Sequence, residues 1–218
     1  MKKENPWKHE NLFYQLSNPS RLRKIIDHYE IYKMIKNIDG DIYEFGVFKG
    51  ASFIRFLTFR EVFNLKNKIY GFDAFGKFPL QKIKDKHFLR DKAFARHHDK
   101  VAGVGIKKNK LKEILKKKKF TNYELIEGDI INSLDKFLSK NKKIKISLLH
   151  IDLDIFHPTI YVLEKLYKYV SKNGIIMFDD YGHIKGATLA VDGFLKKNKH
   201  IKLSKLSKLS RPSFIIKK

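Results

Sequence analysis

Apolar residues along the chain fall into two kinds of run that alternate. Short, β-prone runs predict buried strands at residues 41–47, 68–73, 122–128, 144–151 and 175–178. Apolar residues at helical spacing predict helices at residues 21–37, from about residue 51 onward, and at 106–119, 132–139, 156–173 and 185–196. Two closing strands, 200–206 and 213–216, are expected to pair antiparallel at one edge. This alternation predicts an α/β fold with a mostly parallel sheet.

Residues 144–181 form the unit around which the rest is organised, a strand, a helix and a second strand. The first strand ends in Asp152 and Asp154, and the second ends in Asp179 and Asp180. The two strands of such a unit are parallel, so their carboxyl ends meet at one edge of the sheet, where open parallel sheets bind ligands. Four acids there repel one another unless a cation or protons intervene. A turn or helix cap at residues 179–180 would explain one pair, but not the convergence of both.

A glycine turn, GVFKGAS, follows the strand at residues 41–47. Gly46 and Gly50 allow a ligand to approach the backbone, and the helix that follows offers unpaired N–H groups to an anion. The spacing is neither the dinucleotide pattern G-x-G-x-x-G nor a Walker A pattern. Glu44 precedes the turn, and Asp73 ends the next strand, where nucleotide-type folds hold a ribose diol. The alternative role for Asp73 is a helix or turn cap.

Residues 74–106 are predicted to be irregular, with several glycines and many charges. A connection of this length in a compact domain is usually functional, so we expect a lid or substrate loop. Its basic residues, which would face an anionic substrate, are His87, Arg90, Arg96, His97 and His98.

The formal net charge is +24 over 218 residues, which raises the alternative of a nucleic-acid partner. Arginine, however, occurs at only seven positions, and the excess is lysine, which suggests codon bias as much as a surface for polyanions. The basic charge suits an anionic small substrate equally well. The chain has no cysteine and no apolar run near the ~18 residues of a membrane span, so we expect a soluble, cytoplasmic protein.

Several motifs occur in a fixed order between residues 40 and 195. They are E-x-G-x-x-x-G-x-S at 44–52, F-D-x-F at 72–75, IEGDI at 126–130, HIDLD at 150–154, FDDY at 178–181 and AVDGFL at 190–195. Together they resemble class I S-adenosylmethionine (SAM)-dependent methyltransferases. More closely, they resemble the sugar O-methyltransferases typified by the macrocin, mycinamicin and novobiocin-sugar enzymes.

The resemblance implies a Rossmann-like fold, with a seven-stranded, mostly parallel sheet and helices on both faces. Residues 39–218 would form the methyltransferase domain, with a lid at 74–106, and residues 1–38 a helical extension. Asp73 would hold the ribose hydroxyls of SAM and Asp129 its adenine amino group. The full set of implied SAM-binding residues is Glu44, Gly46, Gly50, Ser52, Asp73 and Asp129. A divalent metal would bind Asp152, Asp179 and Asp180.

The chemistry of the residues agrees with this implication. Oxygen ligands without cysteine favour a hard cation such as Mg²⁺ or Mn²⁺. Transfer of a methyl group to a hydroxyl also requires a base. Asp152 is our first choice for this base and Asp154 the second, with His150 and His183 as further alternatives.

The leading hypothesis is therefore a metal-dependent O-methyltransferase for a sugar hydroxyl. The sugar is expected to be nucleotide-linked and to belong to surface-glycan or secondary-metabolite biosynthesis. One alternative is a nucleic-acid methyltransferase or binder, and another is a non-catalytic relative that binds SAM for structure. The N-terminal arm and the lid make a homodimer plausible.

Overall fold

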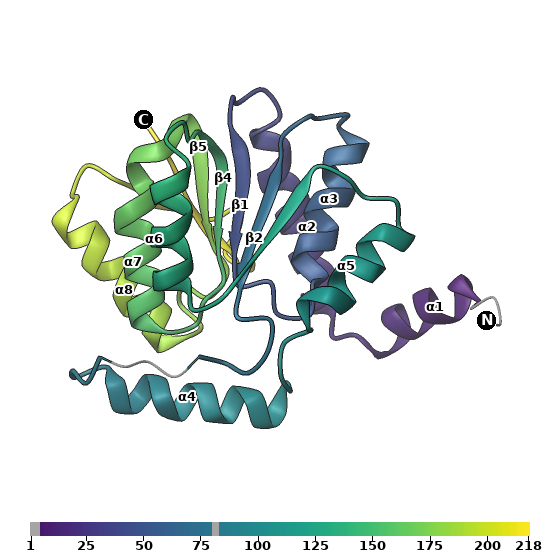
Figure 1. The fold of residues 1–218 in the computed structure, drawn as a ribbon, viewed down its shortest axis with the longest axis horizontal. Coiled ribbons are helices and arrows are strands. Elements are labelled where there is room, and N and C mark those ends of the chain that lie inside the picture. Colours follow the sequence, from purple (N-terminus) through teal and green to yellow (C-terminus); the bar gives the residue numbers. More distant parts are fainter. Residues whose placement is uncertain (1–4, 80–82) are drawn as a thin grey trace.

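The computed structural model describes residues 5–79 and 83–218, and these form one sheet covered by helices on both faces (Figure 1). The strand order is β3-β2-β1-β4-β5-β7-β6. The strands are β1 (Asp41–Phe45), β2 (Ile69–Asp73), β3 (Tyr123–Glu127), β4 (Ile146–Ile151), β5 (Val170–Phe178), β6 (Leu203–Ser204) and β7 (Ser213–Ile216). The first five are parallel, and β7 pairs antiparallel with both β5 and β6. The predicted fold class is confirmed.

The helices form two layers. They are α1 (Pro6–Leu16), α2 (Pro19–Met34), α3 (Ala51–Val62), α4 (Phe88–Val101), α5 (Lys108–Lys117), α6 (Ile130–Lys140), α7 (Phe156–Leu166) and α8 (Lys185–Lys197). One face of the sheet packs on α6, α7 and α8, and the other on α2, α3 and α5 (Figure 1). None of the helices in the described residues combines the length and the hydropathy that a membrane span needs.

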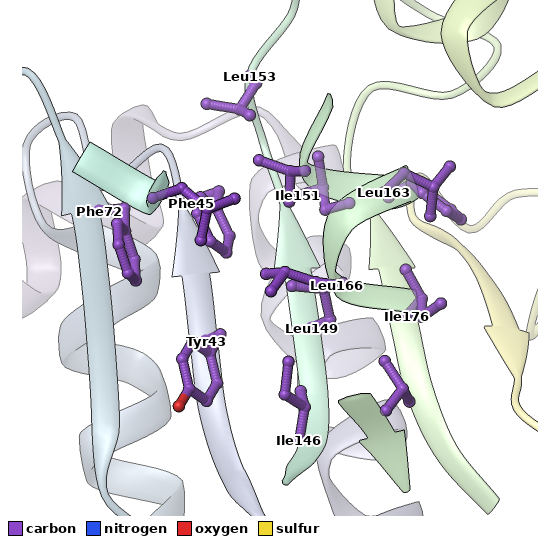
Figure 2. Packing of buried hydrophobic residues seen from close by; sticks show 14 of the residues in the cluster. Tyr43, Phe45, Phe72, Ile146, Leu149, Ile151, Leu153, Leu163, Leu166 and Ile176 are labelled. Atoms are coloured by element: carbon purple, nitrogen blue, oxygen red, sulfur yellow. The ribbon is translucent and has the colours of Figure 1, made fainter. Parts of the chain in front are cut away.

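Successive side chains of each strand point to opposite faces of the sheet, so the core consists of two clusters, one under each helix layer. Tyr43 and Phe45 of β1 pack toward α6 and α7, as Leu149 of β4 does (Figure 2). The intervening residues face α2 and α3, so that Glu44 lies beside His150, its register partner on β4. Two polar side chains are therefore buried beneath α2 and α3, directly below the edge of the sheet at which the acids lie.

Several helices have bounds that differ from the predicted ones, and for two of them the structure shows the cause. The first predicted helix begins at Pro19 rather than Arg21, and its N-cap is Asn18, not Ser20, because the Asn18 side chain accepts the Ser20 N–H. The helix at 156–173 ends at Leu166, and a 3-10 turn (Tyr167–Tyr169) leads into β5. Residues 170–174 join the sheet instead, where the Asn173 N–H donates to Lys217 O and the Lys217 N–H to Gly174 O. Pairing with β7 thus outweighs the local turn signal of Asn-Gly.

The segment predicted to be irregular contains a helix. Within residues 74–106, α4 lies across one end of the sheet (Figure 1). It is anchored by Asp91, whose carboxylate is buried and accepts the N–H of Phe156 at the start of α7. The Gly105 N–H donates to Gly76 O, which closes the other end of the segment. The expectation of a wholly irregular lid was wrong because Asp91 and Ala95, two buried residues of α4, stabilise the helix through tertiary contacts.

The described N-terminal residues form two helices that differ in burial. The described part of the arm forms α1, which has no buried residue and projects from the body of the molecule (Figure 1). In contrast, α2 buries Ile31 and Tyr32 against α3, so it belongs to the main core. The division at residues 38/39 stays a prediction.

Candidate functional site

A cavity of about 440 Å³ lies at the edge of the sheet where the parallel strands end. Its walls come from the glycine turn after β1, the ends of β2, β4 and β5, and parts of α2 and α4. Of the predicted site residues, those lining it are Gly46, Ser52, Asp73, Asp129, Asp152, Asp154 and Asp180. Glu44, Gly50 and Asp179 are not among its described lining residues.

Gly46 allows the ends of β1 and β4 to approach each other. Its φ is +93°, and a Cβ at this position would lie 1.8 Å from the backbone oxygen of Asp152. Only glycine fits this contact, and the contact places the acid-bearing end of β4 beside the glycine turn. Gly50 has a different neighbour, since a Cβ there would lie 2.7 Å from Leu111 Cδ1 of α5.

Asp73 fastens the glycine turn to the end of β2. Its Oδ2 accepts the N–H groups of Val47 and Phe48, both at 2.8 Å, and its Oδ1 accepts the Phe75 N–H at 2.6 Å. Burial raises the pKa of Asp73, although these backbone donors act in the opposite direction. A carboxylate has about four acceptor positions, so about one remains for a ligand. The cap that the sequence offered as an alternative is thus present, and ribose binding by the same carboxylate stays a prediction.

We expect Asp73→Asn to destabilise the protein by about 3 kcal/mol, because the amide turns an N–H₂ group toward backbone donors. For a domain of this size the melting temperature would fall by roughly 10 °C. Thermal unfolding of the variant measures this directly. Asp41→Asn is the matched control, since Asp41 accepts a single N–H, from Lys68. An equal loss in both variants would contradict the anchoring role.

Three carboxylates converge on the cavity. Oxygens of Asp152, Asp154 and Asp180 all lie within 4.8 Å of one another. The Asp154 N–H donates to Asp180 Oδ2 at 3.0 Å, and Asp154 has a φ of +62°, which turns the chain at this point. Burial and then the carboxylate of Asp179 raise the pKa of Asp152 to about 8. Burial, followed by the charges of Asp152 and Asp154, raises the pKa of Asp180 well above its usual range. Burial and mutual repulsion therefore both disfavour the charged forms of these carboxylates, although the Lys24 ammonium, 3.7 Å from Asp152 Oδ2, acts in the opposite direction.

Asp179 lies apart from this cluster. Its Oδ1 accepts from His28 Nε2 at 3.0 Å, and its Oδ2 contacts the ammonium of Lys24. Burial alone would raise the pKa of Asp179, but His28 and Lys24 hold it well below the usual range. Among the described residues two groups could hold a cation: Asp152, Asp154 and Asp180, which line the cavity, and the fully buried His28, His150 and Asp179. The set implied by the sequence, Asp152, Asp179 and Asp180, combines members of both groups and stays a prediction.

Glu44 and His150 form a buried pair below the cavity. His150 Nδ1 lies 3.2 Å from Glu44 Oε1, and both side chains are inaccessible to solvent. Burial opposes a charged ring, but the carboxylates of Asp179 and Glu44 raise the pKa of His150 to about 9. Neither His150 nor the exposed His183 lines the described cavity, so the structure brings neither alternative base into it.

The basic residues expected on the lid are mostly engaged elsewhere. His87 stacks on Phe156 with ring centroids 3.8 Å apart, and Arg90 pairs with Asp91. Arg96 and His97 are exposed away from the described lining, and only His98 contributes to it. His98 lies there among aromatic rings, those of Phe48, Phe78 and Phe94.

Six other cations line the cavity, and our interpretation of the sequence missed them. They are Arg21 and Lys24 of α2, Lys49 of the glycine turn, Arg55 of α3, Lys77 in the segment after β2, and Arg211 in the loop before β7. A signal for the arginines was available. Where lysine is so strongly preferred that only seven of 47 basic residues are arginine, the arginines are the first candidates for positions at which the guanidinium group matters.

Comparisons with known proteins give a family match and likenesses to solved structures. The family model described as macrocin O-methyltransferase (TylF) matches residues 11–209. The structure of CalS11, a calicheamicin methyltransferase, has a TM-score of 0.71 at 22% identity and covers 99% of this chain and 87% of its own. The O-methyltransferase NovP has a TM-score of 0.75 at 17% identity, over 89% of this chain and 79% of its own. These two likenesses show the fold. No curated protein sequence matches the chain.

Proposed function

Because the chain belongs to the macrocin O-methyltransferase (TylF) family, it is a SAM-dependent O-methyltransferase, and we propose that it methylates a sugar hydroxyl with the help of a divalent cation. The observation that carries this proposal is the cluster of Asp152, Asp154 and Asp180, which lies in the same cavity as the glycine turn. CalS11 is described as a TDP-rhamnose 3'-O-methyltransferase, which supports a nucleotide-linked sugar as the acceptor. Surface-glycan or secondary-metabolite biosynthesis is the setting that we propose for it.

SAM would occupy the side of the cavity formed by β1, β2 and the start of α6. Gly46 and Ser52 flank the glycine turn, where backbone N–H groups at the start of α3 would be available to an anionic group of SAM. Asp73 would receive a ribose hydroxyl and Asp129 the adenine amino group. Asp129 lines the cavity, and its side chain also caps α6 by accepting the Asn132 N–H at 3.3 Å. Glu44 would act indirectly, since it is buried beneath the turn.

The acid cluster fits a hard divalent cation. Its donors are carboxylate oxygens, and they lie close enough to share one ion. Burial and mutual repulsion raise the pKa values of Asp152 and Asp180, and a bound cation would offset that repulsion. We therefore propose that Asp152, Asp154 and Asp180 hold Mg²⁺ or Mn²⁺. A cation bound there would act as a Lewis acid that lowers the pKa of a neighbouring hydroxyl.

The residues of the chain supply positioning and proton transfer. Asp152, whose side chain is 25% exposed, can reach the acceptor hydroxyl and take its proton. Phe78 and Phe94, the latter a residue of α4, form part of the cavity wall and would exclude water from the methyl donor. Alignment of the hydroxyl oxygen behind the sulfonium methyl group then accounts for much of the rate.

Binding of Mn²⁺ in the absence of SAM is expected to strengthen with pH. Because the pKa of Asp152 is about 8 without metal, an ion must displace a proton below that pH. The apparent affinity should rise about tenfold per pH unit per displaced proton between pH 6 and 8. Calorimetric titration at both pH values measures this. Asp154→Asn should weaken binding, and Asp39→Asn, which removes an exposed acid, should not. An affinity independent of pH would contradict the assignment.

Calorimetry with SAM, followed by Mg²⁺ and a panel of nucleotide-sugars, tests the function itself. The wild type should bind SAM and then a nucleotide-sugar in a metal-dependent manner, and Asp152→Ala should lose only the second event. Absence of SAM binding would refute the proposal.

The gathering of arginines inside the cavity favours a small anionic acceptor over the nucleic acid that the +24 charge first suggested.

A further inference from the structure

Four of the cations that line the cavity, Arg21, Lys24, Arg55 and Arg211, lie on or beside α2, whereas Lys49 and Lys77 lie on the glycine turn and in the segment after β2. Arg21 and Arg55 lie close enough to repel each other, and so do Lys24 and Arg211. Lys24 is neutralised, because its ammonium contacts Asp179 and lies 3.7 Å from Asp152 Oδ2. Within the described residues, no hydrogen bond or ion pair joins the side chain of Arg21 or Arg211 to an acid. This side of the cavity therefore carries positive charge without a counter-ion.

Of the three arginines on this side of the cavity, Arg55 and Arg211 are held in place by residues of α2. Arg55 Nη1 lies 2.9 Å from His28 Nδ1, and the other nitrogen of this ring binds Asp179. Arg211 is fixed through its backbone, because buried Asp27 accepts its N–H at 3.3 Å and also accepts the Ser210 hydroxyl at 2.9 Å. The turn that carries Arg211 is thus attached to α2. Such fixed cations are organised for a ligand before it binds.

The Arg211 side chain provides an independent observation. Its Nε is buried and has no hydrogen-bond partner among residues 5–79 and 83–218. A buried donor of this kind is costly to leave unsatisfied, and for a guanidinium group the best partner is an oxyanion that accepts two parallel hydrogen bonds. Phosphate and carboxylate oxygens meet this requirement.

We propose that Arg21, Arg55 and Arg211 form an oxyanion subsite that binds the phosphate groups of a nucleotide-linked acceptor. The proposal rests on the proposed function and deepens it, since it orients the substrate. The sugar lies at the acid cluster and the diphosphate lies toward α2. Lys24, between the two, separates the phosphate charge from Asp152 and Asp179. The lid cations that the sequence suggested for this purpose are mostly paired or exposed elsewhere.

SAM also carries an oxyanion, its carboxylate, so the test must separate the two ligands. Calorimetric titrations with S-adenosylhomocysteine, inorganic pyrophosphate and dTDP would be made on the wild type, Arg21→Gln, Arg211→Gln and the double variant. Each substitution is expected to weaken dTDP binding about tenfold or more. The affinity for S-adenosylhomocysteine should stay within about twofold of the wild type. Arg96→Gln, at an exposed position on α4, is the matched control and should change neither affinity.

The possible outcomes are distinct. Loss of S-adenosylhomocysteine affinity with dTDP binding retained would assign the arginines to the cofactor carboxylate and overturn the inference. Unchanged dTDP and pyrophosphate binding in the double variant would overturn it too, as would a wild type that binds S-adenosylhomocysteine but neither phosphate compound. A wild type that binds no S-adenosylhomocysteine would instead refute the proposed function. Unfolding curves of each variant, which should match that of the wild type, exclude a loss through misfolding.

Discussion

Replacing Asp152 with asparagine is expected to lower kcat by about a thousandfold and leave the affinity for SAM within about a factor of two. The amide keeps the size of the side chain but can neither accept the acceptor proton nor contribute negative charge to the acid cluster. We expect kcat rather than the SAM affinity to change because Asp152 follows β4, away from the side of the cavity proposed for SAM. Steady-state kinetics and calorimetry with SAM measure the two quantities separately.

Two further variants show whether the loss of kcat is specific to Asp152. Asp154→Asn reports on the second candidate base. A smaller loss of kcat than in Asp152→Asn supports Asp152 as the base, whereas a larger loss assigns this role to Asp154. Asp39→Asn removes an exposed carboxylate that pairs with Lys145 and should retain full activity. If Asp152→Asn retained wild-type kcat, the proposed chemistry of the acid cluster would be refuted.

Gly46→Ala is expected to have the largest effect on folding. The added Cβ would lie 1.8 Å from the backbone oxygen of Asp152, and the φ of +93° is unfavourable for any other residue. Relief requires separation of β1 from β4 at the cavity, with a cost of about 4 kcal/mol or more. SAM binding should be lost together with stability, since the same contact shapes the glycine turn. Urea unfolding and calorimetry with SAM measure both effects.

Gly193→Ala provides the control for that substitution. Gly193 lies within α8, and a Cβ there meets no atom within 4 Å. Alanine in a helix interior should stabilise the protein by about 0.5–1 kcal/mol. A Gly46→Ala variant that unfolds at the same urea concentration as the wild type would show that the end of β1 tolerates a side chain, contrary to the contact described above.

Short runs of apolar residues and the glycine turn, both visible in a few consecutive residues, predicted much of the fold. The runs that ended in Asp73, in Asp152 and in Asp179-Asp180 are strands in the structure, because continuous β-prone apolar residues have few alternatives to a buried parallel strand. The position of the cavity followed from topology, since parallel strands place their carboxyl ends at one edge. Gly46 in GVFKGAS indicated the position of the cavity for a physical reason, because the backbone oxygen of Asp152 approaches it too closely for any side chain.

The partners of individual acids could not be predicted in the same way. Asp179 and Asp180 are adjacent in sequence, yet one binds His28 and the other binds the backbone of Asp154. Consecutive residues of a strand point to opposite faces, so a shift of one residue decides which partner each meets. The partner of Asp179 lies on α2, 151 residues earlier in the chain. No local pattern carries that information.

The same limitation applies to the lid and to the arginines. The stability of α4 depends on the contact between Asp91 and the start of α7, which propensity does not reveal. Arg21, Arg55 and Arg211 meet only because α2, α3 and the final loop pack on one face of the sheet. In the sequence they are isolated basic residues among many lysines, and only their scarcity distinguishes them.

Transfer of a labelled methyl group from SAM to nucleotide-linked sugars tests the central claim most directly. The protein would be treated with a chelator and then assayed with and without added Mg²⁺. We expect a labelled sugar product and an equal amount of S-adenosylhomocysteine with Mg²⁺, and a rate at least about a hundredfold lower without it. Transfer at full rate to the same sugar in the presence of the chelator would contradict the role of the acid cluster. Labelling of RNA, with none of the sugars accepted, would contradict the sugar acceptor itself.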